Sequence, residues 1–357
     1  MLANRRRLSA VAVLAVAVAA AAGCSSSSSS PGNATGGASA AGGASSGATA
    51  TGAAQAASGS KGTLLMEIPL RTNPSNALMA GGFLTECKSL GYTCEAVGTI
   101  AVDVPGSNAL AAAALARGGV KGFADYGFDP STYPYMTQVS QQYKVPIVSW
   151  HVPIPQGTVK GLTAITDGNP VVGATEAADA MGAKLGGKGT VAITELSFNS
   201  TENDMATNFT TEMKKKYPNI TVLAPQLEGS DPTGAVSKAV SILQGNQNIT
   251  AAFSTTGGGC TTWTGAQSQA NKKLTIVCMD YTPQNLAMVK SGTVFGLVAQ
   301  PLFQEGARAA EILNAAITHQ SVSYNNPLPE GMATLSNIGQ YEQYINDAIK
   351  AGVQGIS

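Results

Sequence analysis

Short runs of apolar and β-branched residues alternate with longer amphipathic stretches from Thr63 onward. Runs such as "TLLMEIPL" and "GTVAITEL" have the length and composition of buried strands. The stretches between such runs are roughly 10–18 residues long, repeat apolar residues at helical spacing, and often stop at a glycine or a proline. This alternation predicts parallel units of strand, helix and strand.

The predicted elements fall into two series. The first has strands at 63–70, 93–100, 122–128 and 146–151, and helices at 76–90, 107–117 and 132–144. The second begins with a strand at 162–167 and continues with strands at 189–196, 220–229, 249–256, 274–280 and 294–300, and helices at 169–185, 200–217, 232–243, 260–271, 283–290 and 303–319. Two such series predict an α/β fold of two doubly wound parallel-sheet lobes, with ligands bound beyond the carboxyl ends of the strands.

The start of the chain has the pattern of an export signal. Arg5, Arg6 and Arg7 precede an apolar stretch, Leu8 to Ala22, that is too short to span a bilayer as a helix. The small residues before Cys24 resemble the lipobox of bacterial lipoproteins, although Ala21 stands where that family usually has leucine. The resemblance implies a signal peptide at 1–23 and a lipid-anchored Cys24 outside the bacterial cell membrane, with plain secretion as the alternative.

Residues 24–61 are expected to form a tether. The segment from Ser25 to Ser60 is almost wholly Ser, Gly, Ala and Thr, so it cannot bury enough apolar surface to offset the entropy lost on ordering. A flexible coil of this length spans about 30–35 Å. We expect it to hold a folded body away from a membrane surface.

Composition argues against nucleic acid as a partner. The chain has 21 basic and 21 acidic residues and a net charge of zero. Its densest basic run, "KKKY" at Lys214 to Tyr217, lies at the end of a predicted helix, where positive charge is favourable. About 295 residues remain after the signal and tether, enough for two domains.

Cysteine usage fits an exported protein. Besides Cys24 the chain has Cys87, Cys94, Cys260 and Cys278, an even number that suggests two disulfides in an oxidising compartment. The preferred pairing is Cys87 with Cys94 and Cys260 with Cys278, and free buried thiols are the alternative. Without a CxxC element or a nearby histidine, no metal site is expected.

Motifs of catalysis are not found in the sequence. It has neither G-x-S-x-G nor H-E-x-x-H, and "TTGGGC" at Thr255 to Cys260 lacks the lysine of a P-loop. We therefore expect no catalytic residue, no cofactor and no enzymatic activity. The glycine run opens a predicted helix, so its N–H groups could face a ligand, or the run could serve only as a turn.

Four motifs carry a resemblance that covers nearly all of the chain from Thr63 to about Gly352. They are "LGY" at Leu90, "VPIVSW" at Val145, "MDYTP" at Met279 and "VAQPLFQEGARAAEIL" at Val298. The order and spacing of these motifs resemble those of type I periplasmic binding proteins of the ribose and galactose kind, the solute receptors of ABC importers.

The resemblance implies three crossover segments between the lobes. We expect them near Asp167, Gln300 and Pro327. The amino-terminal lobe would then comprise residues 62–166 and 301–327, and the carboxy-terminal lobe residues 167–300 and 328–357. A monomer is expected, with an ABC permease as its protein partner.

The resemblance also implies ligand-binding residues. Asp280 matches the family's ligand-binding acid, whose carboxylate would accept hydrogen bonds from two hydroxyls, and Gln300 and Asn73 match polar pocket residues. The alternative for Asp280 is to cap the helix that begins at Pro283. For Gln300 and Asn73 it is ordinary hydrogen bonding within a loop.

The sequence departs from the family at several pocket positions. Ser75 and Asn76 stand where an aromatic pair is usual, His151 and Val152 replace an acidic and basic pair, and no arginine occurs between Ser197 and Lys214. Thr255 and Thr256 replace a common asparagine–aspartate pair. The remaining candidates for ligand contact, each with packing or hydrogen bonding as its alternative, are Trp150, His151, Asn199, Asn203, Thr256, Trp263 and Asn76.

A pocket without lysine or arginine disfavours anionic solutes. We therefore expect a small neutral sugar or polyol, delivered to a permease. Three alternatives stay open: a membrane-tethered sensor subunit for a receptor kinase, a binder of a small non-carbohydrate solute, and a cell-wall hydrolase. A sugar-responsive repressor is disfavoured, because a lipoprotein leader occupies the position of a DNA-reading helix pair.

Overall fold

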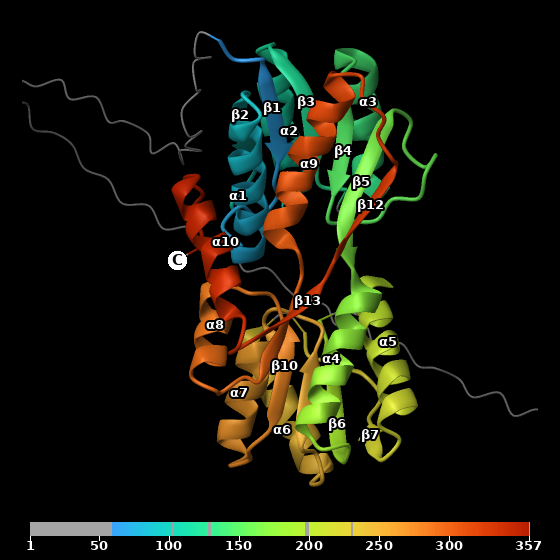
Figure 1. Cartoon of the computed structure of the whole chain (residues 1–357), viewed down its shortest axis with the longest axis vertical. Coiled ribbons are helices and arrows are strands. Elements are labelled where there is room, and N and C mark those ends of the chain that lie inside the picture. The colour runs from blue at the N-terminus through green and yellow to red at the C-terminus, as the bar shows by residue number, and fades with distance from the viewer. Residues whose placement is uncertain (1–58, 102, 128–129, 197–199, 230, 357) are drawn as a thin grey trace, which may run out of the picture. The chain divides into compact units, whose positions relative to one another are not determined.

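The computed structural model describes residues 59–101, 103–127, 130–196, 200–229 and 231–356. Its first sheet has the order β12-β5-β4-β3-β1-β2, with every neighbouring pair parallel (Figure 1). The strands are β1 (Thr63–Glu67), β2 (Thr93–Val97), β3 (Val120–Asp125), β4 (Ile147–Trp150), β5 (Leu162–Asn169) and β12 (Asn325–Pro329). Helices α1 (Pro74–Ser89) and α9 (Leu302–Ile317) cover one face, and α2 (Val104–Ala116) and α3 (Tyr133–Tyr143) the other.

The second sheet has the order β13-β11-β10-β9-β6-β7, with β8 paired to β6 and β13 antiparallel. Its strands are β6 (Gly189–Glu195), β7 (Ile220–Val222), β8 (Gln226–Leu227), β9 (Ala251–Ser254), β10 (Thr275–Met279), β11 (Gly296–Ala299) and β13 (Gly331–Thr334). Helices α4 (Pro170–Lys184) and α5 (Ser200–Lys216) cover one face, and α6 (Pro232–Gly245), α7 (Gly259–Gln269) and α8 (Pro283–Lys290) the other. The predicted α/β fold of two doubly wound lobes is confirmed.

Two details differ from the predicted elements. The strand at 162–169 completes the first sheet and does not begin the second. Strands β12 and β13 and helix α10 (Ile338–Lys350) lie beyond the last predicted helix. The segment "NNPLP" of β12 does not read as a strand because it contains two prolines, and its position at the edge of the sheet is where proline is tolerated.

The described chain passes between the two sheets at three places. It leaves the first sheet where β5 runs into α4, at Asn169 and Pro170. It returns between β11 and α9, at Gln300 and Pro301, and crosses again at Glu330, between β12 and β13. These passages surround the ends of the strands at which ligands of such folds bind.

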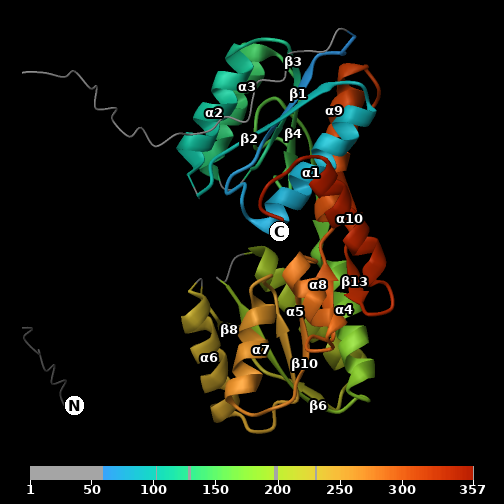
Figure 2. The ribbon, with the colours of Figure 1, turned by 90° about the vertical axis from the view of Figure 1, so that its left-hand side faces the viewer.

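Helices α1 and α9 approach each other closely at two glycines. A Cβ atom on Gly82 would collide with the carbonyl of Phe303, and one on Gly306 with the carbonyl of Met79. Helix α10 packs on α1 next to Gly81 (Figure 2). Helix α10 also contacts α8 and β13, so it joins the helices of the first sheet to elements of the second.

Candidate functional site

Acidic and aromatic side chains occupy the carboxyl ends of the parallel strands. In the first sheet, β1 ends at Glu67, β3 at Asp125 and β4 at Trp150. In the second sheet, β6 ends at Glu195, and Asp280 follows β10 directly. Because ligands of doubly wound sheets bind at these ends, they form the candidate site.

Two residues that directly follow these strands have a left-handed backbone. His151, after β4, has φ of 68°, and Asp280, after β10, has φ of 67°. Their N–H groups still continue the sheets, donating to the carbonyls of Thr166 (2.8 Å) and Val298 (3.0 Å). Side chains with a Cβ rarely adopt this conformation, and such residues concentrate at functional sites. The backbone thus singles out the same two residues as the family resemblance.

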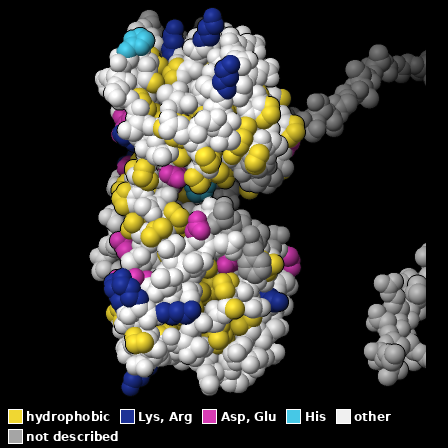
Figure 3. Space-filling model, turned by 90° about the vertical axis from the view of Figure 1, so that its right-hand side faces the viewer, with side chains coloured by type: hydrophobic (Ala, Val, Ile, Leu, Met, Phe, Trp, Pro, Cys, Tyr) yellow, Lys and Arg dark blue, Asp and Glu magenta, His cyan; other side chains and the backbone are white. Residues whose placement is uncertain are grey.

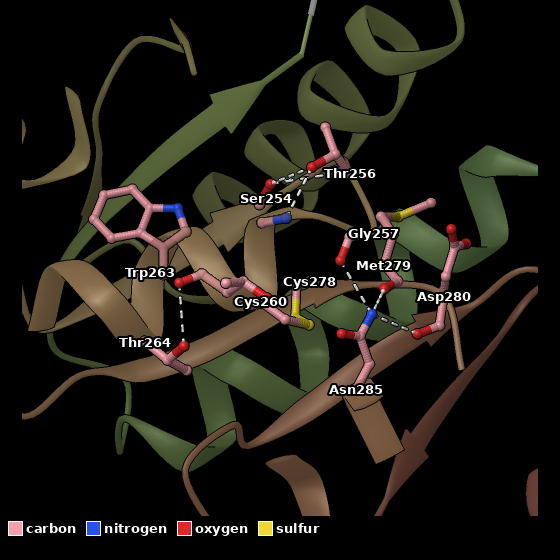
Figure 4. The surroundings of a disulfide bond; sticks show 12 residues. Ser254, Thr256, Gly257, Cys260, Trp263, Thr264, Cys278, Met279, Asp280 and Asn285 are labelled. Carbon is pink, nitrogen blue, oxygen red and sulfur yellow. Dashed lines mark hydrogen bonds between the residues drawn. A yellow bond between two sulfur atoms is a disulfide. The ribbon is translucent and has the colours of Figure 1, made fainter. Parts of the chain in front are cut away.

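The turn that contains Asp280 is held by Asn285. Its Nδ2 atom donates to the carbonyls of Gly257 (3.1 Å), Met279 (3.0 Å) and Asp280 (3.0 Å), as Figure 4 shows. Thr282 caps helix α8, accepting a hydrogen bond from the N–H of Asn285 (3.2 Å). The alternative in which Asp280 serves as this helix cap is therefore wrong, and its carboxylate has another role.

The carboxylate of Asp280 reaches the other lobe. Its Oδ2 atom accepts a hydrogen bond from Ser75 Oγ of α1 (2.9 Å), while Oδ1 is buried and has no hydrogen-bond partner among the described residues. Burial raises the pKa of Asp280, although Ser75 and His151 lower it. One carboxylate oxygen is thus free to accept a donor from a ligand.

His151 forms an ion pair with Glu305 of α9. The distance from Nδ1 to Oε2 is 2.9 Å, and Glu305 is fully buried. Burial lowers the pKa of His151, but the carboxylates of Glu305, Asp280 and Glu330 raise it by more, so the net shift is upward. These carboxylates therefore favour the protonated form of the histidine.

Each passage between the sheets carries one carboxyl group: Asp167 in β5, Glu305 at the start of α9, and Glu330 between β12 and β13. We call these three residues the hinge acids. Burial, followed by the charge of Glu305, raises the pKa of Asp167 to about 6 and that of Glu330 to about 8. A Cβ atom on Gly168 or Gly173 would collide with the carboxyl group of Glu330, so both glycines make room for it.

Aromatic rings lie beside the hinge acids. Trp150 is fully buried and stacks on Tyr126, with 4.5 Å between the ring centroids, and Tyr126 also faces His151 at 6.0 Å. The Nε1 atom of Trp150 is buried without a hydrogen-bond partner in the described part of the chain. An indole donor left without an acceptor points to a water molecule or a ligand nearby.

The predicted amide residues of the first lobe are tied to the backbone. Asn73 caps α1, its Oδ1 accepting from the N–H groups of Ser75 (2.9 Å) and Asn76 (3.3 Å). Asn76 donates from Nδ2 to the carbonyl of Pro69 (2.6 Å). Gln300 is half-buried at the second passage between the sheets. These contacts account for Asn73 and Asn76 without a ligand and leave their predicted role in binding open.

The predicted residues of the second lobe lie in different settings. Trp263 is fully buried in α7 and donates from Nε1 to Thr194 Oγ1 (2.9 Å), so packing and this hydrogen bond account for it. Thr256 donates to Glu228 Oε1 (2.7 Å) and accepts from the N–H of Gly259 (2.9 Å), so it shapes the glycine turn before α7. Asn203 is exposed on α5, and Asn199 lies outside the described residues.

Sequence reasoning missed Glu305, Glu330, Tyr126 and Asn285. A signal for Glu305 was present, because it shares the buried face of α9 with Leu302, Gly306 and Ala309, at helical spacing. A charged residue in such a stripe needs a partner. For Glu330, Tyr126 and Asn285 the chain offers no comparable local pattern.

Both predicted disulfides are present. Cys87 pairs with Cys94, and Cys260 with Cys278. The second bond joins the first turn of α7 to β10, one residue before Met279 and two before Asp280 (Figure 4). Cys24 and the predicted tether lie outside the described residues.

Among the described residues, no helix is both long and apolar enough to cross a membrane. No group of three or more His, Cys, Asp or Glu residues in this part of the chain could hold a metal ion.

Comparison with known proteins identifies related folds. The family model described as "Periplasmic binding protein domain" matches residues 68–321. No curated protein matches the sequence.

Several solved structures share the fold. AraP, an arabinose binding protein from Geobacillus stearothermophilus, is 19% identical with a TM-score of 0.70, covering 78% of this chain and 99% of its own. A sugar-binding protein of a sugar ABC transporter from Bacillus halodurans is 20% identical with a TM-score of 0.70 and the same two coverages. An ABC transporter solute-binding protein from Actinobacillus succinogenes, with bound D-allose, is 18% identical with a TM-score of 0.69, again covering 78% and 99%.

Proposed function

Because the chain belongs to the periplasmic binding protein domain family, a family of extracytoplasmic solute-binding proteins and not of enzymes, we propose that it is the solute receptor of an ABC importer. It binds a sugar or polyol between its two lobes and delivers it to a permease. Cys24 carries a lipid that anchors it outside the cell membrane, and residues 24–61 form the tether.

The observation that carries this proposal is the environment of Asp280. Its carboxylate stands at the end of a parallel strand, bonds across to Ser75 of the other lobe, and keeps Oδ1 without a partner among the described residues. A carboxylate accepts strong hydrogen bonds from hydroxyl groups, which a sugar or polyol supplies in adjacent pairs. The solved structures named above bind arabinose, an unspecified sugar or D-allose, which supports the same class of solute.

The mechanism follows from the three passages. The lobes open when empty and close when a solute bridges Asp280 and the groups of the first lobe. A solute that enters the site must replace the Ser75–Asp280 hydrogen bond with bonds of its own, so only a solute that satisfies both sides stabilises the closed form. The permease then recognises the closed pair of lobes.

Solute binding is tested by a thermal-shift screen of the full-length protein against sugars and polyols. A solute present at 100 times its Kd stabilises the folded state by about 2.7 kcal/mol. Asp280→Asn should abolish the shift, whereas Asp347→Asn, a control on α10 that is half-buried and lies outside the candidate site, should keep it. If no sugar or polyol shifts the melting temperature, this assignment of the solute is wrong.

Transport and anchoring need separate measurements. Deletion of the gene should abolish uptake of the solute found in the screen, and unchanged uptake would reject a role in import. Mass spectrometry of the mature amino terminus should find an acylated Cys24, and Cys24→Ala should release the protein from the membrane fraction. An unmodified amino terminus would indicate plain secretion.

A further inference from the structure

The charged groups around Asp280 are almost all acidic. The groups that act on the charge of Asp280 or of its neighbour Glu330 are His151 and the hinge acids. On the face shown in Figure 3, acidic side chains gather at the middle of the surface, and Lys and Arg side chains lie mostly toward the two ends. Four carboxyl groups thus surround a single histidine.

The ion pairs formed by lysines and arginines of the described residues all involve acids outside this cluster. They join Arg117 to Glu95, Lys215 and Lys216 to Glu212, Lys216 to Asp179, Lys290 to Glu342, Arg308 to Glu311 and Lys350 to Asp347. Arg71 follows β1, but it lines a separate pocket of about 240 Å³ between α1, β2 and residues 351–354. No described lysine or arginine is therefore paired with the acids of the candidate site.

Several buried polar atoms of this cluster have no partner in the described chain. They are Glu305 Oε1, Glu330 Oε2, Asp280 Oδ1 and Trp150 Nε1. Glu305 and Trp150 are fully buried, and Glu330 is 2% exposed. Three of these atoms are carboxyl oxygens that call for a donor, and one is an indole N–H that calls for an acceptor.

The aromatic pair adds a surface suited to a cation. Tyr126 is half-buried, stacks on Trp150, and lies near enough to Glu67 and Glu305 for both charges to act on its hydroxyl. The faces of tyrosine and tryptophan rings attract cations. Carboxylates next to such faces form a site for an ammonium group.

We propose that the bound solute carries a protonated amine as well as hydroxyl groups, as an amino sugar does, with the amine held by Asp280 and the hinge acids beside Tyr126. This inference rests on the proposed solute-binding function and refines it. The amine donates to the unpartnered carboxyl oxygens, and a hydroxyl or ring oxygen of the solute accepts from the indole of Trp150.

The energetic reason is charge compensation. A buried carboxylate without a partner is costly, and an ammonium group that donates to it removes this cost. A neutral hydroxyl donates a hydrogen bond but leaves the charge uncompensated. The site therefore favours an amine over the hydroxyl that replaces it in the parent sugar.

Proton release gives the proposal a second signature. The pKa values of Asp167, Asp280 and Glu330 are raised, so these groups stay protonated at a higher pH than free carboxyl groups do. An ammonium group binds the charged carboxylates. Its binding therefore releases protons, and its affinity rises with pH. His151 acts in the same direction, because its cation repels an ammonium and is lost as the pH rises. The titratable groups that face the cluster are Glu67, Tyr126, His151, Asp167, Asp280, Tyr281, Glu305 and Glu330.

The test is titration calorimetry of the full-length protein. Three pairs of probes differ only in the amine: glucosamine and glucose, galactosamine and galactose, and mannosamine and mannose. At least one amino sugar should bind about tenfold or more tightly than its neutral parent, the factor that corresponds to 1.4 kcal/mol. Its affinity should rise between pH 5.5 and 7.0, with protons released to the buffer.

Further measurements distinguish a failure of the amine preference from a failure of the proposed function. N-acetylation of the amino sugar should remove the advantage, and Asp280→Asn should remove it while Asp347→Asn keeps it. If neutral sugars bind as tightly as amino sugars, the inference is wrong and the proposed function stands. If choline or cyclohexylamine binds and no sugar does, the charge preference holds and the sugar assignment is wrong. If no probe binds, and no sugar or polyol of the thermal-shift screen binds either, to protein that unfolds cooperatively, both are wrong.

Discussion

Strands β4 and β10 occupy the same position in the two sheets, but the residues that follow them differ in charge. After β4 stands a base, His151, and after β10 an acid, Asp280, each with the same left-handed backbone. His151 is committed to Glu305 in a buried ion pair, whereas Asp280 bonds to a neutral hydroxyl and keeps one oxygen without a partner among the described residues. We therefore expect a division of roles, in which His151 stabilises the hinge and Asp280 contacts the solute.

The largest expected effect concerns the buried pair. Glu305→Ala should lower the free energy of unfolding by about 3 kcal/mol, because it removes the buried partner of His151, whose side chain is only 23% exposed. Glu311→Ala, which breaks an exposed ion pair on the same helix, should cost at most about 1 kcal/mol. Urea unfolding of both variants measures the contrast, and equal losses would contradict the assignment of His151 to the hinge.

The second experiment replaces each of the two residues that follow the strands, Asp280 and His151, by alanine in turn. Asp280→Ala should weaken solute binding by about 2–3 kcal/mol, since it removes charged hydrogen bonds, and should change stability much less. His151→Ala should do the opposite, lowering stability more than affinity. Calorimetry and thermal unfolding of each variant decide, and matching profiles would remove the proposed division of roles.

The two disulfides extend the comparison between the lobes. Both join a helix to the following strand, but Cys87–Cys94 lies at the start of β2 and Cys260–Cys278 at the carboxyl end of β10. Replacing either cysteine pair by alanine should lower the free energy of unfolding by about 2–3 kcal/mol, because the unfolded chain gains the entropy of the loop that the disulfide had closed. Only the Cys260→Ala, Cys278→Ala variant should also weaken solute binding, because its disulfide adjoins the turn of Asp280. Equal binding by both double variants would contradict this.

The smallest expected effect is the response of the empty protein to pH. Asp167, with a pKa of about 6, and Glu330, with a pKa of about 8, bind protons more tightly folded than unfolded. Their stabilising contribution is complete below the unfolded pKa near 4 and is lost as the pH rises through the folded values. Solvent screening reduces the contribution of the half-buried Asp167, and relaxation around Glu330 reduces the other, so we expect stability to fall by about 1–3 kcal/mol between pH 5 and 8. Glu330→Gln should flatten this profile in thermal unfolding, and a steeper decline would refute the assignment.

The fold was largely predictable because local signals agree. Buried β-branched runs, amphipathic helices and glycine stops give the order of elements through α9. The prediction failed where tertiary context overrides the local pattern, as in β12, whose prolines are tolerated only because it pairs along one edge. The strand at 162–167 was grouped with the second series because sequence rhythm does not reveal which sheet a strand joins, whereas the lobe bounds implied by the resemblance, 62–166, place most of it in the first lobe.

The site was predictable only in part. Asp280 and His151 follow recognisable strands, so their positions at the strand ends could be inferred. A pocket without lysine and arginine disfavours anions, but it does not separate neutral solutes from cations. That distinction depends on Glu305 and Glu330, which lie more than 20 residues beyond Asp280 in the chain and meet it only in the folded protein.

The close contact of α1 and α9 has a consequence for how this receptor can change its specificity. Ser75 stands on α1 and Glu305 on α9, so the glycines at the crossing, Gly82 and Gly306, determine the spacing between a residue that meets Asp280 and the partner of His151. New pockets can evolve by exchanging the side chains that line them. Enlarging either glycine would instead shift whole helices, so we expect a mutational scan to find these two remote positions less tolerant than the pocket itself.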